Sequence, residues 1–189
     1  DSAVGPDGIP YSAYSANTEL SAQILATTTQ YFALHEDVAG LEVFNRQFVW
    51  FAPKGELDED SIAVIRTAGN LRTIFGSNTD SKYIASGIAD SLADPTFAIT
   101  PPAQRGFCRG RQLSLNVVDI DTYMRMFNIL SGFYNTSGVF KGNICDIPAA
   151  MLYDFCNAFP TLLHEWMWLV LNVLKIPKVI LRVIECLYT

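Results

Sequence analysis

The sequence predicts an α+β protein in which helices pack on a small, mostly antiparallel sheet. Half of its 189 residues are hydrophobic and only 17% are charged, which is typical of a folded domain with a core and not of a disordered segment. Two short runs of aromatic and β-branched residues, 47–51 and 71–75, predict strands. Longer segments before and after these runs repeat apolar residues at helical spacing.

The N-terminal region predicts a turn followed by a helix. Pro6 presets φ and Gly8 tolerates a positive φ, so residues 5–8 favour a turn. Asn17 is a suitable N-cap for the helix that follows. The apolar residues expected on one face of that helix are Leu20, Ile24, Tyr31 and Phe32.

The two predicted strands form a hairpin-like pair. Pro53 stops the first strand, because proline cannot donate to a sheet ladder. Residues 56–60 are acidic and predict an exposed loop between the strands.

Helices are predicted after the second strand. Residues 81–92 repeat apolar side chains at helical spacing, with Asp80 as the expected cap. The prolines expected to interrupt the chain next are Pro95, Pro101 and Pro102. A further helix is predicted at 115–130. Its expected apolar side consists of Val118, Met126 and Leu130.

The C-terminal part predicts a loop, a buried strand and two helices. The loop covers 132–143, which is rich in Gly and Asn, and the strand is the apolar run 149–153, ending at Asp154. One helix is expected near 162–174, and Pro177 opens the next in its first turn. Both helices look apolar nearly all round, so we expect other chain segments to cover them.

The charge of the chain is uneven. The net charge of −6 counts against a nucleic-acid binder. Residues 1–100 carry 13 acidic and 5 basic residues, net −8, whereas 101–189 carry 6 acidic and 8 basic residues, net +2. Positive charge gathers further at Arg105, Arg109 and Arg111. Composition alone favours a solvated loop for this cluster over a binding surface.

The cysteines and histidines predict no metal site. The four cysteines lie far apart without ligand spacing, which is typical of reduced thiols packed as small hydrophobes inside cells. They are Cys108, Cys145, Cys156 and Cys186. The histidines, His35 and His164, are isolated. The longest apolar stretch, 166–174, is too short to span a membrane, so no membrane partner is expected. The expected location is intracellular, in the nucleus or cytoplasm.

Five blocks of the sequence, in order, resemble the reverse transcriptase of non-LTR retrotransposons (long interspersed elements). The first is similar to the opening GPDGI segment of that family, the second to N-[YF]-R-P-I-S-L-x-N-x-D-x-K, the third to Q-x-G-F-x-x-G-R, the fourth to D-x-x-x-A-F-D, and the fifth to the helix pair that follows. Each block alone is weak, but the order and spacing from residue 5 to residue 188 make a strong signal. The blocks are 5–10, 53–55 with 70–82, 104–112, 154–159, and 173–177 with 187–188.

The resemblance implies part of a right-hand RNA-directed DNA polymerase. Residues 1–145 would be the fingers region and 146–189 the start of the palm, together forming one truncated domain. Its partners would be an RNA template, a DNA primer, deoxynucleoside triphosphates and the missing C-terminal palm and thumb of the parent chain. Mg²⁺ would be the cofactor of the complete domain, acting as a pair of ions.

The resemblance also assigns roles to individual residues. Asp154 would be the catalytic carboxylate and a Mg²⁺ ligand, with the carbonyl of Phe155 as another ligand at the nucleotide site. Phe159 would stack under the sugar of the nucleotide. Lys54 and Arg72 would bind the triphosphate. The positions that resemble template contacts are Arg105, Arg109 and Arg111.

Structural roles compete with each of these assignments, and the sequence departs from the family. Asp154 also suits a helix cap, Phe159 a core, and Lys54 or Arg72 a solvated face. Pro160 replaces the second carboxylate of the palm motif, Thr73 replaces a proline, and acidic residues lie between Lys54 and Arg72.

The paired aspartates of the family are expected beyond residue 189, so the chain as given is expected to be inactive. Two alternatives to an enzyme fragment remain: a non-catalytic module that binds template RNA or DNA, and a decayed mobile-element remnant.

Overall fold

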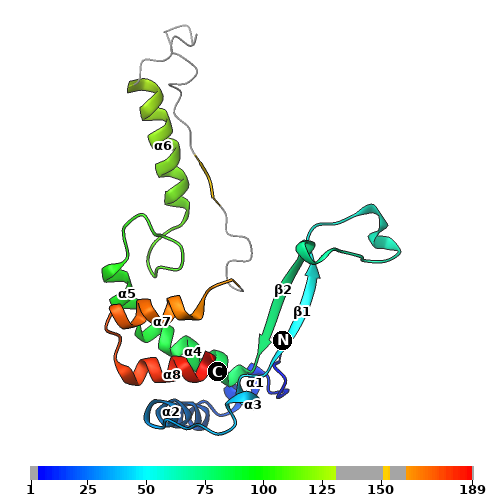
Figure 1. Cartoon of the computed structure of the whole chain (residues 1–189), viewed down its shortest axis with the longest axis vertical. Helices are drawn as coiled ribbons and strands as arrows, with labels where there is room; N and C mark the ends of the chain where they lie inside the picture. Colours follow the sequence, from blue (N-terminus) through cyan, green and yellow to red (C-terminus); the bar gives the residue numbers. More distant parts are fainter. Residues whose placement is uncertain (1–3, 131–150, 154–160, 189) are drawn as a thin grey trace. The chain divides into compact units, whose positions relative to one another are not determined.

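A computed structural model describes residues 4–130, 151–153 and 161–188 (Figure 1). The described part is mostly helical and contains a two-stranded antiparallel sheet, which confirms the α+β class in its general form. The chain divides into two compact units, one formed by 1–90 with 167–189 and the other by 91–166.

The helices and strands follow one another along both units. The first unit contains α1 (Tyr11–Ala16), α2 (Thr18–Leu34), α3 (Leu41–Phe44), β1 (Gln47–Pro53), β2 (Leu71–Ser77), α4 (Thr79–Ser91) and α8 (Lys178–Tyr188). The second contains α5 (Ala93–Ile99) and α6 (Ser114–Leu130). Helix α7 (His164–Val173) begins in the second unit and ends in the first.

Helix α2 begins where the sequence predicts. The side-chain oxygen of Asn17 accepts a hydrogen bond from the backbone N–H of Leu20 at 3.1 Å, and this capping bond satisfies an amide that has no partner within the helix. The face that packs inward differs from the predicted one. Phe32 is buried with Leu25 and Ala33 beside it, whereas Leu20, Ile24 and Tyr31 are exposed.

The core of the first unit joins helices that are distant in sequence. It consists of Phe32 from α2, Ile84 from α4, and Val183 and Cys186 from α8. Phe44 packs edge-on against Phe32, with ring centroids 5.1 Å apart. Helix α8 lies against α2 (Figure 1), so the last described helix of the chain completes a core that the first helices begin.

Helix α8 is amphipathic, not apolar all round as its composition suggested. Val183 and Cys186 are buried, while Arg182 and Glu185 form an ion pair at 3.0 Å on another side. Arg182 also donates to the carbonyl oxygens of His35 and Glu36, just after the end of α2. These bonds satisfy carbonyls that follow a helix without a glycine cap. Burial raises the pKa of the Cys186 thiol, which lies in this interface.

Strands β1 and β2 form the predicted hairpin. Gln47 pairs with Ser77 at the base, and Pro53 pairs with Leu71 at the other end. The indole ring of Trp50, which pairs with Ile74, packs over Gly76, where an added Cβ would overlap the ring. The strand therefore needs glycine at position 76. Phe48, Trp50 and Phe75 remain about half exposed.

The second unit shows two helices, one of which corrects a prediction. Pro95 does not interrupt the chain but lies in the first turn of α5, where the missing N–H has no helical acceptor to lose. Helix α6 confirms the prediction at 115–130. Two residues of its expected apolar side, Val118 and Met126, are about half exposed, and the side chain of Leu130 lies outside the described part.

The remaining expectations are confirmed for the closing helices and not for the strand at 149–153. Helices α7 and α8 lie where they were predicted, with Pro177 directly before α8. Met151, Leu152 and Tyr153 form no strand and are 71%, 86% and 86% exposed. No described strand pairs with them, and a buried strand needs such a partner. The loop predicted at 132–143 lies outside the described residues.

Asp80 is a second local correction. Helix α4 begins at Thr79, so Asp80 lies inside its first turn and not at the cap position.

Within the described residues, no helix is long and apolar enough to cross a membrane.

We predict that Val183→Ala lowers the free energy of unfolding by about 2 kcal/mol, because it removes buried methyl groups and leaves a cavity. Val179→Ala is the matched control, since Val179 lies on the same helix and is 52% exposed, against 2% for Val183. Urea unfolding followed by circular dichroism measures both. Equal losses in the two variants would contradict the packing of α8 against α2.

Candidate functional site

The turn at residues 5–8 docks on the start of α4. The backbone N–H of Asp7 donates to Oδ1 of Asn78 at 3.2 Å, and Oγ1 of Thr79 donates to the carbonyl oxygen of Ile9 at 2.7 Å. Asn78 and Thr79 are 5% and 0% exposed. Two of the blocks that resemble the reverse transcriptase family, 5–10 and 70–82, are therefore in direct contact.

Glycine is required at two positions of this turn. An added Cβ on Gly5 would overlap the side chain and backbone of Asn78. Gly8 has a φ of +73°, which costs side-chain-bearing residues energy, and its N–H donates to the carbonyl oxygen of Gly5 at 3.0 Å. Asp7 completes the turn by accepting a hydrogen bond from the N–H of Ile9 at 3.0 Å.

Tyrosines and carboxylates surround this junction. The Tyr83 ring lies 5.2 Å from that of Tyr11 and 5.3 Å from that of Tyr14, and the Lys82 ammonium lies 5.8 Å from the Tyr11 ring centroid. Burial raises the pKa of Asp80, although a hydrogen bond from the Ser81 N–H opposes the shift. Burial likewise raises the pKa of Tyr14, and the nearby carboxylates of Asp80 and Asp7 raise it further.

Lys54 and Arg72 lie at the end of the hairpin that is distant from Asn78. Arg72 pairs with Ala52, and the Lys54 N–H donates to the carbonyl oxygen of Asn70 at 2.8 Å. Because side chains alternate along a strand, this register puts Lys54 and Arg72 on the same face of the ribbon. Arg72 is exposed, and Nζ of Lys54 donates to the carbonyl oxygen of Gly69 at 3.2 Å.

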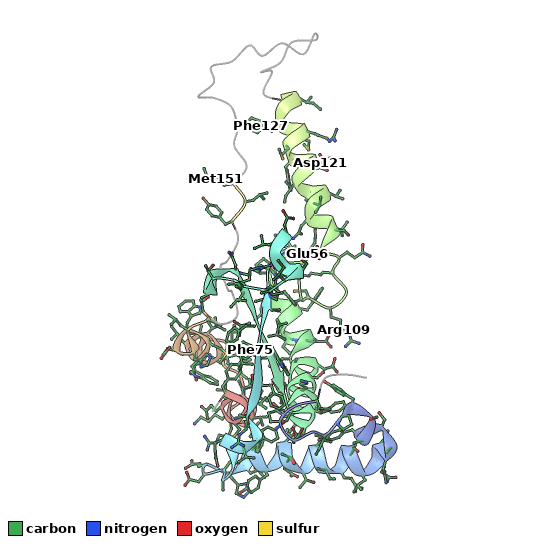
Figure 2. All side chains as sticks on the ribbon, turned by 90° about the vertical axis from the view of Figure 1, so that its right-hand side faces the viewer. Glu56, Phe75, Arg109, Asp121, Phe127 and Met151 are labelled. Carbon is green, nitrogen blue, oxygen red and sulfur yellow. The ribbon has the colours of Figure 1, made fainter. Side chains whose placement is uncertain are left out.

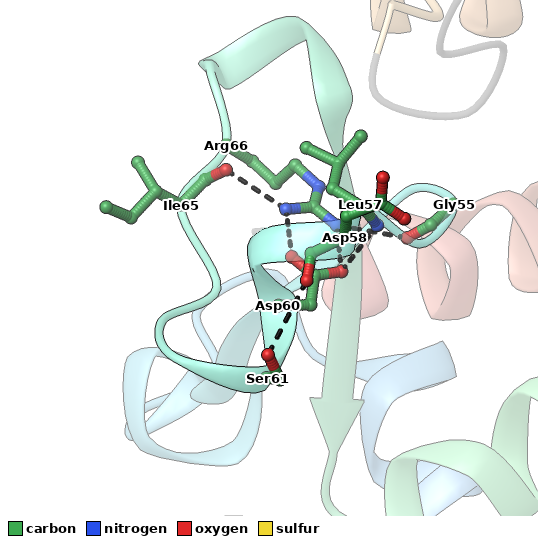
Figure 3. A network of polar contacts seen from close by, with 7 residues as sticks. All are labelled: Gly55, Leu57, Asp58, Asp60, Ser61, Ile65 and Arg66. Carbon is green, nitrogen blue, oxygen red and sulfur yellow. Dashed lines mark hydrogen bonds and ion pairs between the residues drawn. The ribbon is translucent and has the colours of Figure 1, made fainter.

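The loop between β1 and β2 contains an ion pair that was not predicted from the sequence (Figure 3). Arg66 and Asp60 form a bidentate pair with distances of 2.6 and 2.5 Å. The same guanidinium donates to the carbonyl oxygens of Gly55 and Ile65. Arg66 therefore neutralises one of the acidic residues between Lys54 and Arg72, whereas Glu56 stays exposed at this end of the hairpin (Figure 2).

The pair lowers the pKa of Asp60 to about 2, first through the Arg66 hydrogen bond and then through the N–H of Leu57. A depressed pKa in the folded state means that the ionised carboxylate stabilises this loop. That contribution is present above the ordinary value of 3.8 and is lost as pH falls through about 2.

Arg111 organises the segment between α5 and α6. Its guanidinium donates to the carbonyl oxygens of Thr100, Pro101 and Gln104 at 3.0, 2.6 and 2.7 Å. A longer bond of 3.4 Å reaches the carbonyl oxygen of Phe97, and the guanidinium carbon lies 4.5 Å from the centroid of that ring. Arg111 thus satisfies carbonyls at the C-terminal end of α5, which has no glycine cap.

The other two arginines predicted to contact template lie in the same unit. Arg105 forms an ion pair with Asp119 at 2.7 Å and donates to Oδ1 of Asn116 at 3.1 Å. Arg109 lies on the loop before α6 (Figure 2). All three arginines therefore lie in the segment between α5 and α6. Their contact with a template stays a prediction.

Three predicted site residues, Asp154, Phe155 and Phe159, lie outside the described residues. Within 4–130, 151–153 and 161–188, His, Cys, Asp and Glu form no group of three or more that could hold a metal ion. Asn78, Thr79, Asp60 and Arg66 are the site residues to which sequence reasoning gave no role. Asn78 and Thr79 were within a recognised block, whereas nothing in the sequence marked Arg66.

We predict that the Asp60 carboxyl titrates near pH 2 in the folded protein, which the chemical shift of its side-chain carbon measures. Arg66→Met removes the first cause of the shift and should raise the midpoint toward the ordinary value of 3.8. A midpoint near that value in the unmodified protein would show that the pair does not form in solution.

We predict that Arg111→Lys destabilises the second unit by about 2 kcal/mol, because lysine keeps the charge but loses the planar fork that bonds several carbonyls. Hydrogen exchange of the α5 amides measures the loss locally. Arg125→Lys is the control, since Arg125 only meets Asp121 in an exposed pair on α6. Unchanged protection of the α5 amides in the Arg111 variant would show that Arg111 does not stabilise the end of α5.

Comparison with known proteins gives no relative: no family model matches the chain, and no curated protein or solved structure matches it.

Proposed function

We propose that the chain is part of an RNA-directed DNA polymerase of the non-LTR retrotransposon type, with the fingers at 1–145 and the start of the palm at 146–189. The observation that carries the proposal is the contact between the turn at 5–10 and the start of α4. Both segments were recognised from sequence alone, and 71 positions separate Asp7 from Asn78. Motifs that matched by chance would have no reason to be hydrogen-bonded to each other.

The hairpin supports the nucleotide-binding part of the proposal. It carries Lys54 and Arg72 on one face, and its two strands contain no carboxylate. A triphosphate is recognised by a guanidinium fork and an ammonium charge. In this role Arg72 would bind the phosphates with two N–H groups, and Lys54 would contribute positive charge beside it.

The proposed chemistry also depends on residues outside the described part. Asp154 and the carbonyl of Phe155 offer the hard oxygen ligands that Mg²⁺ prefers, and the ions would neutralise charge on the phosphates. Phe159 would lie under the sugar. The 189 residues contain no aromatic-x-Asp-Asp sequence, so the proposed active site needs carboxylates from the parent polypeptide.

The test uses the parent polypeptide, extended past residue 189, in primer extension on an RNA template. We predict that Asp154→Asn reduces incorporation to near zero without unfolding the protein, since members of a catalytic unit act together. Arg72→Ala should raise KM for the deoxynucleotide by about tenfold, the effect of losing a charge-assisted hydrogen bond.

Arg125→Ala is the control for the Arg72 variant, because Arg125 lies in an exposed ion pair on α6. Full incorporation by the Asp154 variant would refute the assignment of Asp154. A parent without an aromatic-x-Asp-Asp sequence would refute the polymerase.

A non-catalytic template-binding module is the second candidate. Pro160, which stands where the family has its second palm carboxylate, favours it. Such a module would bind template–primer with an affinity that falls as salt rises and would incorporate no nucleotide. Pro160 and the acidic residues between Lys54 and Arg72 equally favour a decayed remnant, which would neither bind template–primer nor incorporate nucleotides.

A further inference from the structure

The loop that joins α5 to α6 exposes an aromatic side chain without packing it. Phe107 is 102% exposed, as much as a free residue, and its φ is +60°. Bulky residues rarely adopt this left-handed conformation, because Cβ approaches the backbone carbonyl. Burial does not offset the strain here, since the ring packs against no neighbour in the described part of the chain.

The backbone on both sides of Phe107 is held in place. Nε2 of Gln104 donates to the carbonyl oxygen of Gly106 at 3.0 Å, and the N–H of Arg111 donates to the carbonyl oxygen of Cys108 at 3.1 Å. The guanidinium of Arg111 ties the same loop to the end of α5 through several carbonyls. The loop therefore holds the Phe107 ring in solvent on a braced backbone. Strained residues that persist in this way are concentrated at ligand-binding sites.

The positive charge around Phe107 indicates which class of ligand would bind there. Residues 104–113 include three arginines and no carboxylate, in a chain whose net charge is −6. Arg105 is paired with Asp119, whereas the acceptors found for Arg111 are neutral carbonyls that leave its charge in place. An exposed ring beside uncompensated positive charge matches a nucleobase attached to its phosphate, because the ring stacks on the base while the cation attracts the phosphate.

We propose that Phe107 stacks on an unpaired base of single-stranded template RNA. This deepens the proposed function and rests on it. Arg111 and Arg105 brace the loop, the charge of Arg111 attracts the phosphate, and Phe107 is the group that stacks on the base. The stack is independent of sequence, since every base has a π-face.

The test measures binding of the whole chain to a single-stranded RNA oligonucleotide containing 2-aminopurine, whose fluorescence falls when the base stacks. We expect Phe107→Ala and Phe107→Leu to weaken binding by about tenfold and to remove the quenching, because neither side chain stacks. Phe107→Tyr should bind within about twofold of the unmodified chain. The slope of affinity against salt should not change, since the phosphate contacts remain.

The variants also separate stacking from other roles. Retained affinity in Phe107→Leu would overturn the proposal, because it would show that binding does not depend on stacking by an aromatic ring. Equal affinity in Phe107→Ala would overturn it while leaving the proposed function intact. If the unmodified chain bound no RNA at low salt, the proposed function would fail together with it. Phe107→Gly should unfold at the same or a higher temperature, because it removes strain and no packing; a lower temperature would show that the ring is structural.

Discussion

The fold of the first unit depends on one buried amide, the side chain of Asn78. It occupies the single residue between β2 and α4, where its Oδ1 accepts from the N–H of Asp7 and its Nδ2 donates to the carbonyl oxygen of Phe44. A buried amide with an unpaired end loses the hydration energy of that end, so a pair of bonds at its two ends avoids this cost. Asn78 thereby fixes the N-terminal turn, the end of α3, the base of the hairpin and the first turn of α4 in one place.

A second amide extends this connection to the C-terminal helix. Nδ2 of Asn45 donates to the carbonyl oxygen of Cys186 at 2.7 Å, while Oδ1 of Asn45 is buried and has no hydrogen-bond partner in the described structure. Asn78 holds the last residue of α3, and Asn45, the next in the chain, holds α8. The hydrophobic contacts among Phe32, Ile84 and Val183 therefore join segments that these side-chain hydrogen bonds also connect.

The sequence predicted local structure better than long-range structure, for physical reasons. The Asn17 cap and the hairpin depend on nearby residues, and both are present. Of the four residues predicted on the inward face of α2, Phe32 is buried and Leu20, Ile24 and Tyr31 are exposed. Apolar residues occur on more than one side of that helix, and α8, which lies far along the chain, decides which side is buried. The residues predicted as a buried strand at 149–153 include Met151 to Tyr153, where the structure describes no partner strand. Such a strand depends on pairing that a local pattern does not specify.

The partners of charged residues were also not predicted from the sequence. From sequence, the arginines near 105–111 were interpreted as template contacts, and the acidic loop as unfavourable for a triphosphate. In the structure Arg111 and Arg182 satisfy carbonyls at the ends of α5 and α2, and Arg66 neutralises Asp60. Template contact by the arginines near 105–111 stays a prediction. A guanidinium has several donors on a long, flexible side chain, so its partners range from the neighbouring residue, as for Arg66 and Ile65, to one 147 positions away, as for Arg182 and His35. Sequence spacing alone does not identify them.

Arg66, Arg111 and Arg182 thus stabilise the structure, whereas Lys54 and Arg72 lie on one face of the hairpin. Lys54 and Arg72 lie at the end of a ribbon whose base is fixed by Asn78, about 20 Å away at the rise of an antiparallel strand. An isolated two-stranded ribbon is only marginally stable, and this one has half-exposed side chains on both faces. Bending of the ribbon would move both cations together without disturbing Phe32, Ile84 or Val183 in the core. The anchor at Asn78 thus lets the end of the hairpin that carries Lys54 and Arg72 adjust while the rest of the unit keeps its packing.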